Sequence, residues 1–85
     1  MLEVVSAKYV DSFKVCVSFS NGESGVIDLF EALWGPVFEP LKEPEQFKNF
    51  EVSKVLHTIS WPNGADFAPE FLYERMVEQA NAADS

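Results

Sequence analysis

The fold is decided largely by residues 59–74, which read ISWPNGADFAPEFLYE. An apolar run that ends at Trp61 passes into Pro-Asn-Gly at residues 62–64, residue types that dominate tight turns because they fix φ or tolerate positive φ. Pro69 stands where a helix can begin, since proline is favoured at the first helical position. These residues therefore predict a strand, a turn and the start of a helix.

The helix that starts at Pro69 is predicted to run to Ala80. Its apolar residues recur at helical spacing, so we expect one face to pack on the core. These residues are Leu72, Tyr73, Met76, Val77 and Ala80. We expect residues 81–85 to form a frayed tail. Residues 1–80 are expected to form one domain, because single cores commonly use about 50 to 200 residues.

The N-terminal part predicts a three-stranded antiparallel meander over residues 2–10, 13–20 and 23–28. The middle strand is clearest, because apolar and polar residues alternate through it. Its apolar face carries Phe13, Val15, Val17 and Phe19. Asn21-Gly22 suits the positive φ angles of a two-residue type I′ hairpin, and Gly25 marks a bulge or an edge.

Shorter elements are expected between the meander and the final helix. Asp28 suits a helix N-cap, and the helix can run only to about Trp34 because Gly35-Pro36 stops it. The apolar stripe of this helix would lie on the sheet and comprises Leu29, Phe30, Leu33 and Trp34. In the connector over residues 35–43, the residues expected to point inward are Val37, Phe38 and Leu41.

Residues 44–48 predict one helical turn with Pro44 at its first position. Two more strands are expected over residues 50–54 and 55–61. In the second of them, Val55, His57, Ile59 and Trp61 would share a face. The predicted fold class is therefore α+β: an antiparallel meander of three N-terminal strands plus one or two further strands, packed by short helices and a C-terminal helix.

Charge limits the classes of partner. The 85 residues include 14 acids and 6 bases, which gives a net charge of −8. Nucleic-acid affinity rests largely on Lys and Arg neutralising phosphates, so we expect no direct nucleic-acid binding and no contact with an anionic membrane. The charge suits a basic partner, or it only keeps an aromatic-rich protein soluble.

No segment approaches the roughly 18 apolar residues of a membrane helix, and the N-terminus lacks the features of a signal peptide. Cys16 is the single cysteine, so no internal disulfide can form. We therefore expect a cytoplasmic protein with no membrane segment.

The sequence offers few groups for catalysis or metal binding. Cys16 and His57 are the only cysteine and histidine, and both fall in expected strands with nothing to bring them together as a nucleophile and base. They are too few for a structural zinc site, which takes four ligands. Asp66 and Glu70 could form an oxygen site, but carboxylates near a helix N-terminus also stabilise the helix dipole. We expect no enzyme activity, no cofactor and no metal.

One corner of the expected fold remains as a candidate interaction or ligand site, formed by Trp61, Asn63 and Asp66 around the turn. Trp61 could stack on a ligand, although an aromatic residue at a strand end is more often part of the core. Asn63 is explained equally well by the turn, and Asp66 by the helix entrance.

The sequence resembles domain-of-unknown-function family 2442 over nearly its whole length. The most specific likeness is WPNGAD at residues 61–66 followed by APEFLY at 68–73. Weaker likenesses are FKVCVSF at 13–19 with NGE at 21–23, VIDL at 26–29, VFEPL at 37–41, and Phe47. The resemblance implies an α+β domain of a meander and further strands covered by short helices, and it implies no established activity.

The resemblance also implies two settings for such domains. Some relatives carry a helix-turn-helix DNA-binding region after the domain, and others lie beside a small protein as in toxin–antitoxin pairs. The sequence ends at Ser85, and we expect no helix-turn-helix DNA-binding region after the domain. Protein binding is therefore the stronger expectation.

Two functions are therefore expected as alternatives. The first is a non-enzymatic protein-interaction module, an antitoxin-like or regulatory partner of a small basic protein. The edges of an open meander can pair with another chain, which also leaves a homodimer open. The alternative is a small-molecule-sensing domain with a pocket near Trp61, Asn63 and Asp66.

Overall fold

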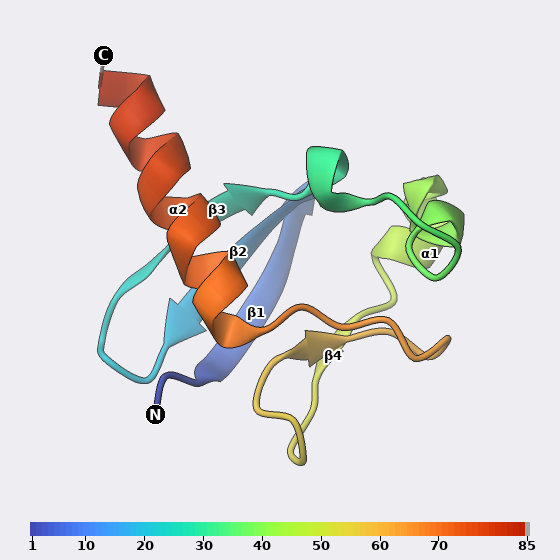
Figure 1. The fold of residues 1–85 in the computed structure, drawn as a ribbon, viewed down its shortest axis with the longest axis horizontal. Coiled ribbons are helices and arrows are strands. Elements are labelled where there is room, and N and C mark those ends of the chain that lie inside the picture. The colour runs from blue at the N-terminus through green and yellow to red at the C-terminus, as the bar shows by residue number, and fades with distance from the viewer. Residues whose placement is uncertain (85) are drawn as a thin grey trace.

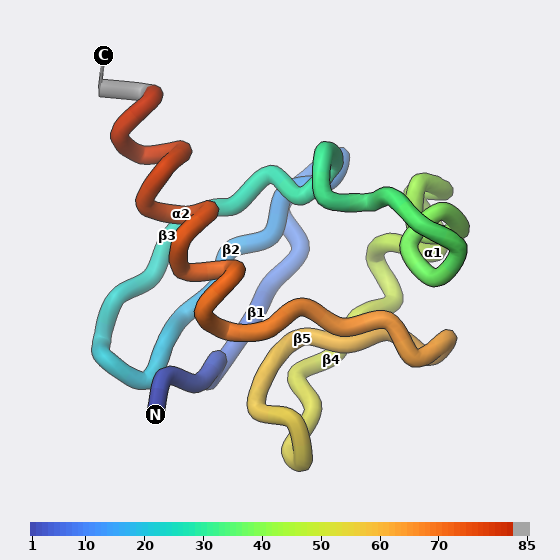
Figure 2. Tube along the Cα trace, in the orientation of Figure 1, coloured from blue at the N-terminus to red at the C-terminus, as the bar shows by residue number. Residues whose placement is uncertain are grey.

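The computed structural model describes residues 1–84, which form an α+β domain (Figure 1). Its three-stranded sheet has the order β1-β2-β3 with antiparallel neighbours, which confirms the predicted meander and fold class. The strands are β1 (Val4–Asp11), β2 (Lys14–Phe19) and β3 (Ser24–Asp28). The long helix α2 (Pro69–Asp84) crosses one face of this sheet (Figure 1). In the view of Figures 1 and 2, α2 is on the left, and the short helical turns from the middle of the chain are on the right.

The alternation predicted for β2 is confirmed, since Val15, Val17 and Phe19 are buried. The alternation of β1 is interrupted because its register with β2 shifts twice, between Val4 and Ser6 and between Tyr9 and Asp11. Such irregularities leave an extra residue outside the regular pairing.

The predicted two-residue type I′ hairpin is wrong. Residues 20–22 form a three-residue loop, because the N–H of Phe19 bonds to the carbonyl of Glu23 (2.8 Å). The N–H of Gly22 bonds to the carbonyl of Phe19 (3.1 Å), and Gly22 alone in the loop has positive φ (+88°). Asn21 instead accepts a hydrogen bond from the N–H of Glu23 through Oδ1 (3.0 Å). These features match a type I turn followed by a glycine bulge.

The helix expected after Asp28 is a single 3-10 turn, η1 (Phe30–Ala32). Asp28 ends β3, and its Oδ1 accepts a hydrogen bond from the N–H of Phe30 (3.0 Å). A three-residue turn is too short to present one apolar stripe, so the expected packing of four residues on the sheet is wrong for two of them. Leu29 and Leu33 are buried, whereas Phe30 and Trp34 are exposed.

The connector contains a second 3-10 turn, η2 (Glu39–Lys42), which buries Leu41. Phe38 is half-buried as expected, but Val37 is 46% exposed, so its expected inward position is wrong. The helical turn with Pro44 at its first position is confirmed as α1 (Pro44–Phe47).

Strands β4 (Glu51–Val52) and β5 (Ile59–Ser60) form a separate two-stranded sheet. The strand expected over residues 55–61 is thus wrong for its first half. A turn occupies residues 53–58, where Ser53 Oγ accepts hydrogen bonds from the N–H groups of Val55 and Leu56 (3.2 and 3.0 Å). His57 has φ +56° in this turn, and it lies exposed with Val55, while Ile59 and Trp61 are buried.

Helix α2 begins at Pro69 as predicted and buries Leu72 and Met76. The expected packing face is wrong for Val77 and Ala80, which are exposed. The helix continues to Asp84, so residues 81–84 are helical instead of forming the expected tail; Ser85 lies outside the described residues. No glycine or proline follows Ala80 to stop the helix.

At Gly25, the Met76 side chain of α2 packs closely on β3. It pairs with Val17 in regular register, so it marks no bulge. A Cβ added at Gly25 would stand 2.8 Å from Sδ of Met76, closer than side chains approach. The glycine therefore lets the helix lie directly against the edge strand.

Candidate functional site

Trp61 is part of the aromatic core. It is 4% exposed, and its Nε1 donates a hydrogen bond to the carbonyl of Phe47 (2.8 Å). Its ring lies 5.8 Å from that of Phe47 and 5.8 Å, edge to face, from that of Phe67. The backbone of Trp61 also closes the turn, since its N–H bonds to the carbonyl of Ala65 (2.9 Å). Its burial and contacts support a structural role.

Asn63 joins the turn to the connector. Its Nδ2 donates to the carbonyl of Val37 (2.9 Å), and its Oδ1 accepts from the N–H of Ala65 (3.1 Å). Both ends of this amide are therefore engaged within the chain. Asp66 forms an isolated antiparallel bridge with Ser60 and is exposed.

The structure brings two of these three residues to one hollow. A shallow hollow of about 370 Å³ is lined by Pro40, Leu41, Gln46, Asn49, Trp61, Pro62 and Asn63. Asp66 is not part of this wall. Ligand binding at the corner stays a prediction, and the polar atoms of Trp61 and Asn63 already have partners in the protein.

Cys16 and His57 lie in different places. Cys16 is central in the sheet, opposite Lys8 and Val26. His57 is in the 53–58 turn, where its carbonyl bonds to the N–H of Val4 (2.9 Å) and its Nδ1 lies 3.6 Å from Glu3 Oε2. Within residues 1–84, no group of three His, Cys, Asp or Glu side chains is arranged to hold a metal ion.

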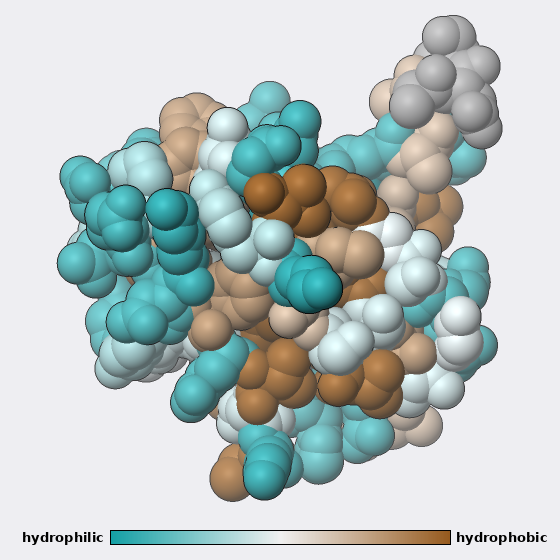
Figure 3. Space-filling view, turned by 180° about the vertical axis from the view of Figure 1, so that it is seen from behind, coloured by the Kyte–Doolittle hydropathy of each residue, from teal (hydrophilic) through white to brown (hydrophobic). Residues whose placement is uncertain are grey.

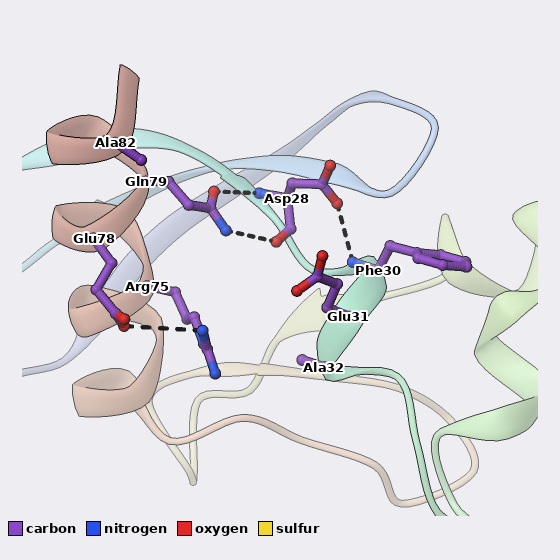
Figure 4. A pocket seen from close by; sticks show the side chains of 8 residues that line it. All are labelled: Asp28, Phe30, Glu31, Ala32, Arg75, Glu78, Gln79 and Ala82. Carbon is purple, nitrogen blue, oxygen red and sulfur yellow. Dashed lines mark hydrogen bonds and ion pairs between the residues drawn. The ribbon is translucent and has the colours of Figure 1, made fainter. Parts of the chain in front are cut away.

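Another hollow is one that the sequence did not indicate. It measures about 580 Å³ and lies between η1 and α2 (Figure 4). Gln79 reaches across from α2, where its Oε1 accepts from the N–H of Asp28 and its Nε2 donates to the carbonyl of Asp28 (both 2.9 Å). The Arg75 guanidinium lies 3.9 Å from Glu78 Oε1 and 5.2 Å from the centre of the Phe71 ring.

The walls of this hollow are mainly acidic. Carboxylates come from Asp28, Glu31 and Glu78, against the one guanidinium of Arg75 (Figure 4). Such a surface attracts a cationic group. No sequence signal pointed to this hollow, because its two walls come from segments about fifty residues apart, as the Asp28–Gln79 contact shows, and meet only when the chain folds.

Three exposed apolar side chains come from the segment that follows β3. Phe30 is 48% exposed, Trp34 is 72% exposed and Val37 is 46% exposed. The sheet face turned away from α2 is different, because its hydrophobic side chains form separate groups among polar ones (Figure 3). The sequence contained a usable signal for Trp34: it directly precedes Gly35-Pro36, where a helix is too short to bury all of its apolar residues.

Acids lie beside several of the six Lys and Arg side chains. Lys42 lies 3.2 Å from Glu39, Lys48 lies 3.4 Å from Glu45, and Arg75 lies 3.9 Å from Glu78. Lys14 stands between Asp11 on β1 and Asp28 on β3 in the strand register. Three of the six bases therefore lie in ion pairs, which reduces what the domain offers to a phosphate backbone.

Tyr73 links α2 to the start of β3. Its hydroxyl donates a hydrogen bond to Glu23 Oε2, and its ring packs edge to face with Phe19 at 5.4 Å. The hydrogen bond to the Glu23 carboxylate raises the pKa of Tyr73, because it favours the neutral phenol; partial burial and the carboxylate charge act in the same direction.

The fold and surface define a small acidic α+β domain with solvent-exposed aromatic residues. The chain belongs to the family described as "Protein of unknown function (DUF2442)", whose sequence profile matches residues 4–78. The resemblance found in the sequence is thereby confirmed. No curated protein matches the chain. Among residues 1–84, the helices are too short or too polar to span a bilayer.

A solved structure shares the fold. It is that of "Putative DNA Binding Protein NE0471" from Nitrosomonas europaea, with a TM-score of 0.83 and 20% sequence identity. The similarity covers 95% of this chain and 52% of that chain, so this chain spans about half the length of that protein. A likeness at this identity concerns the fold alone.

Proposed function

We propose that the protein is a non-enzymatic interaction module, the acidic partner of a small basic protein in an antitoxin-like or regulatory pair in the cytoplasm. The observation that carries this proposal is the exposure of Trp34 at 72%; Phe30 and Val37, close to it in the sequence, are also exposed. Tryptophan is enriched among residues that dominate binding energy at protein interfaces.

The charge of the chain supports a basic partner. The net charge of −8 accelerates encounter with a positively charged protein and disfavours acidic ones. The same charge, together with the paired positions of Lys42, Lys48 and Arg75, argues against direct DNA binding by this domain. The Nitrosomonas europaea protein is about twice as long as the matched region, and its name refers to DNA binding. We do not extend that name to this domain.

The proposal is tested by affinity capture from the native host with two matched variants. Trp34→Ser removes the exposed indole, and Val55→Ser removes an apolar side chain that is 85% exposed in the 53–58 turn. We expect a stoichiometric basic protein to bind the wild type and Val55→Ser but not Trp34→Ser. Failure to recover any stoichiometric partner, or equal recovery by both variants, would contradict the proposal.

A small-molecule-sensing role at the Trp61 corner is the second candidate. It is favoured by the 370 Å³ hollow that Trp61 and Asn63 line. A thermal-shift screen of metabolites would detect it, and Asp66→Ala offers a test without loss of core packing because Asp66 is exposed. A flat screen, or stabilisation that is unchanged in Asp66→Ala, counts against the predicted three-residue site.

A further inference from the structure

Strand β3 has a free edge whose outward backbone groups can be assigned from the register. The N–H of Leu29 bonds to the carbonyl of Phe13, and the N–H of Phe19 bonds to the carbonyl of Glu23. Backbone groups alternate in direction along an antiparallel strand. The N–H and C=O groups of Ser24, Val26 and Asp28 therefore point away from β2.

The Gln79 side chain already forms hydrogen bonds with one set of these outward backbone groups. Its amide exchanges two hydrogen bonds with the N–H and carbonyl of Asp28, both 2.9 Å long. Residues of neighbouring strands exchange the same pair of bonds in a hydrogen-bonded position. The side chain thus occupies the Asp28 end of the edge, and no hydrogen bond to another described element occupies the outward groups of Ser24 and Val26.

A groove accompanies this part of the edge. It measures about 450 Å³ and is lined by residues 23–26 of the strand side and by Met76, Val77, Gln79, Ala80 and Asn81 of α2. The last turns of α2 extend beyond β3, away from the sheet (Figure 1). A strand added beside β3 would therefore lie against the side of this helix, where Val77 and Ala80 are exposed.

Among residues 1–84, the lining of the groove carries one carboxylate, Glu23, and no base. Two more carboxylates, Glu74 and Glu78, line a neighbouring hollow of about 260 Å³, and Val77 lines both hollows. Helix α2 carries the base Arg75, whose guanidinium lies near Glu78 and the Phe71 ring and does not line the groove. The charge of the groove therefore complements a basic segment.

We propose that the β3–α2 groove binds an extended basic segment of a partner protein, which adds as a fourth strand beside Ser24 and Val26. This inference rests on the proposed function; it adds a second contact surface besides the exposed Trp34 and names the chemistry of the segment that binds there. Main-chain hydrogen bonds to the edge supply affinity, and alternate side chains supply specificity. A second copy of this chain is disfavoured as the occupant, because pairing would bring together two chains of net charge −8.

The test uses a capped synthetic peptide of alternating lysine and valine, about six residues long, which spans about 20 Å when extended. Binding is followed through the backbone amide signals and hydrogen-exchange rates of Ser24 and Val26 by NMR. We expect both amides to shift and to become protected when the peptide is added. A peptide with glutamate in place of lysine should leave them unchanged.

Two variants separate edge pairing from general charge attraction. Val77→Lys places a positive charge in the groove and should weaken peptide binding at least tenfold, whereas Val55→Lys makes the same change in the distant 53–58 turn and should bind as the wild type does. Val26→Pro removes one outward N–H, a change tolerated on a free edge, and should also weaken binding.

The proposal fails if saturating lysine peptide leaves the Ser24 and Val26 amides unchanged, or if Val77→Lys and Val55→Lys bind it equally. It also fails if both amides are protected without peptide while sedimentation shows a dimer, since a second copy then occupies the edge. Partner capture that depends on Trp34 but proceeds normally in Val77→Lys would leave the proposed function standing and refute this groove as its site.

Discussion

The two tryptophans provide a matched test of which aromatic residue holds the fold and which is available for binding. We consider Trp61→Phe and Trp34→Phe, the same substitution at a side chain that is 4% exposed and at one that is 72% exposed. Phenylalanine keeps an aromatic ring at each site but removes the indole N–H. At Trp61 this leaves the carbonyl of Phe47 without the hydrogen bond of 2.8 Å.

The magnitude follows from two losses at Trp61. An unpaired buried carbonyl costs about 1–3 kcal/mol. The smaller ring leaves a void on the order of 40 Å³, which adds about 1 kcal/mol at roughly 24 cal/mol per Å³. We expect Trp61→Phe to lower the free energy of unfolding by about 2–4 kcal/mol, a large share of the stability of a small domain. Its Tm should fall by at least about 8 °C.

Urea denaturation with an unchanged m-value measures this difference. Trp34→Phe should change the free energy of unfolding by less than about 0.5 kcal/mol, because exposed substitutions away from structural contacts have small effects. Equal losses for the two variants, or a loss below about 0.5 kcal/mol for Trp61→Phe, would refute the placement of Trp61 in the core.

Three other outcomes follow from the structure. Gly25→Ala should lose about 1–3 kcal/mol by overpacking against Met76, and a double-mutant cycle with Met76→Ala should show coupling; strictly additive losses would contradict the contact. Gly64→Val should lower the Tm more than Gly64→Asn does, because φ is +92° at this position; equal melting of the two would reject the turn. The raised pKa of Tyr73 should appear in an NMR titration of the phenol and should drop in Glu23→Gln. Since the folded pKa is the higher one, the stabilising hydrogen bond is fully present below about pH 10 and is lost as pH rises through the folded pKa; stability that is flat through this range would count against it.

Several elements could be predicted because a local rule applies to them. The alternation of β2 predicts its buried face, since side chains of a strand point to opposite sides and Val15, Val17 and Phe19 are indeed buried. Pro44 and Pro69 mark the first residues of α1 and α2, because proline is preorganised for that position.

Other features depend on which of several competing local hydrogen bonds forms in the folded chain. The hairpin at residues 20–22 follows the pairing of Phe19 with Glu23 instead of the preference of Asn21-Gly22. The apolar pattern near Val55 does not form a strand, because Ser53 captures two N–H groups of the turn. Ser and Asn side chains compete with strand pairing for nearby backbone N–H groups, and the apolar pattern alone did not show that this competition ends the strand.

The candidate site likewise combines features predicted from the sequence with features seen only in the structure. The α+β class, the turn at residues 62–64, the helix from Pro69 and the acidic charge all follow from residue type and spacing. The burial of Trp61, the contact of α2 with Gly25 and the groove along β3 could be read only from the folded chain. Burial and grooves arise from contacts between segments far apart in the chain, and those contacts form only when the elements pack.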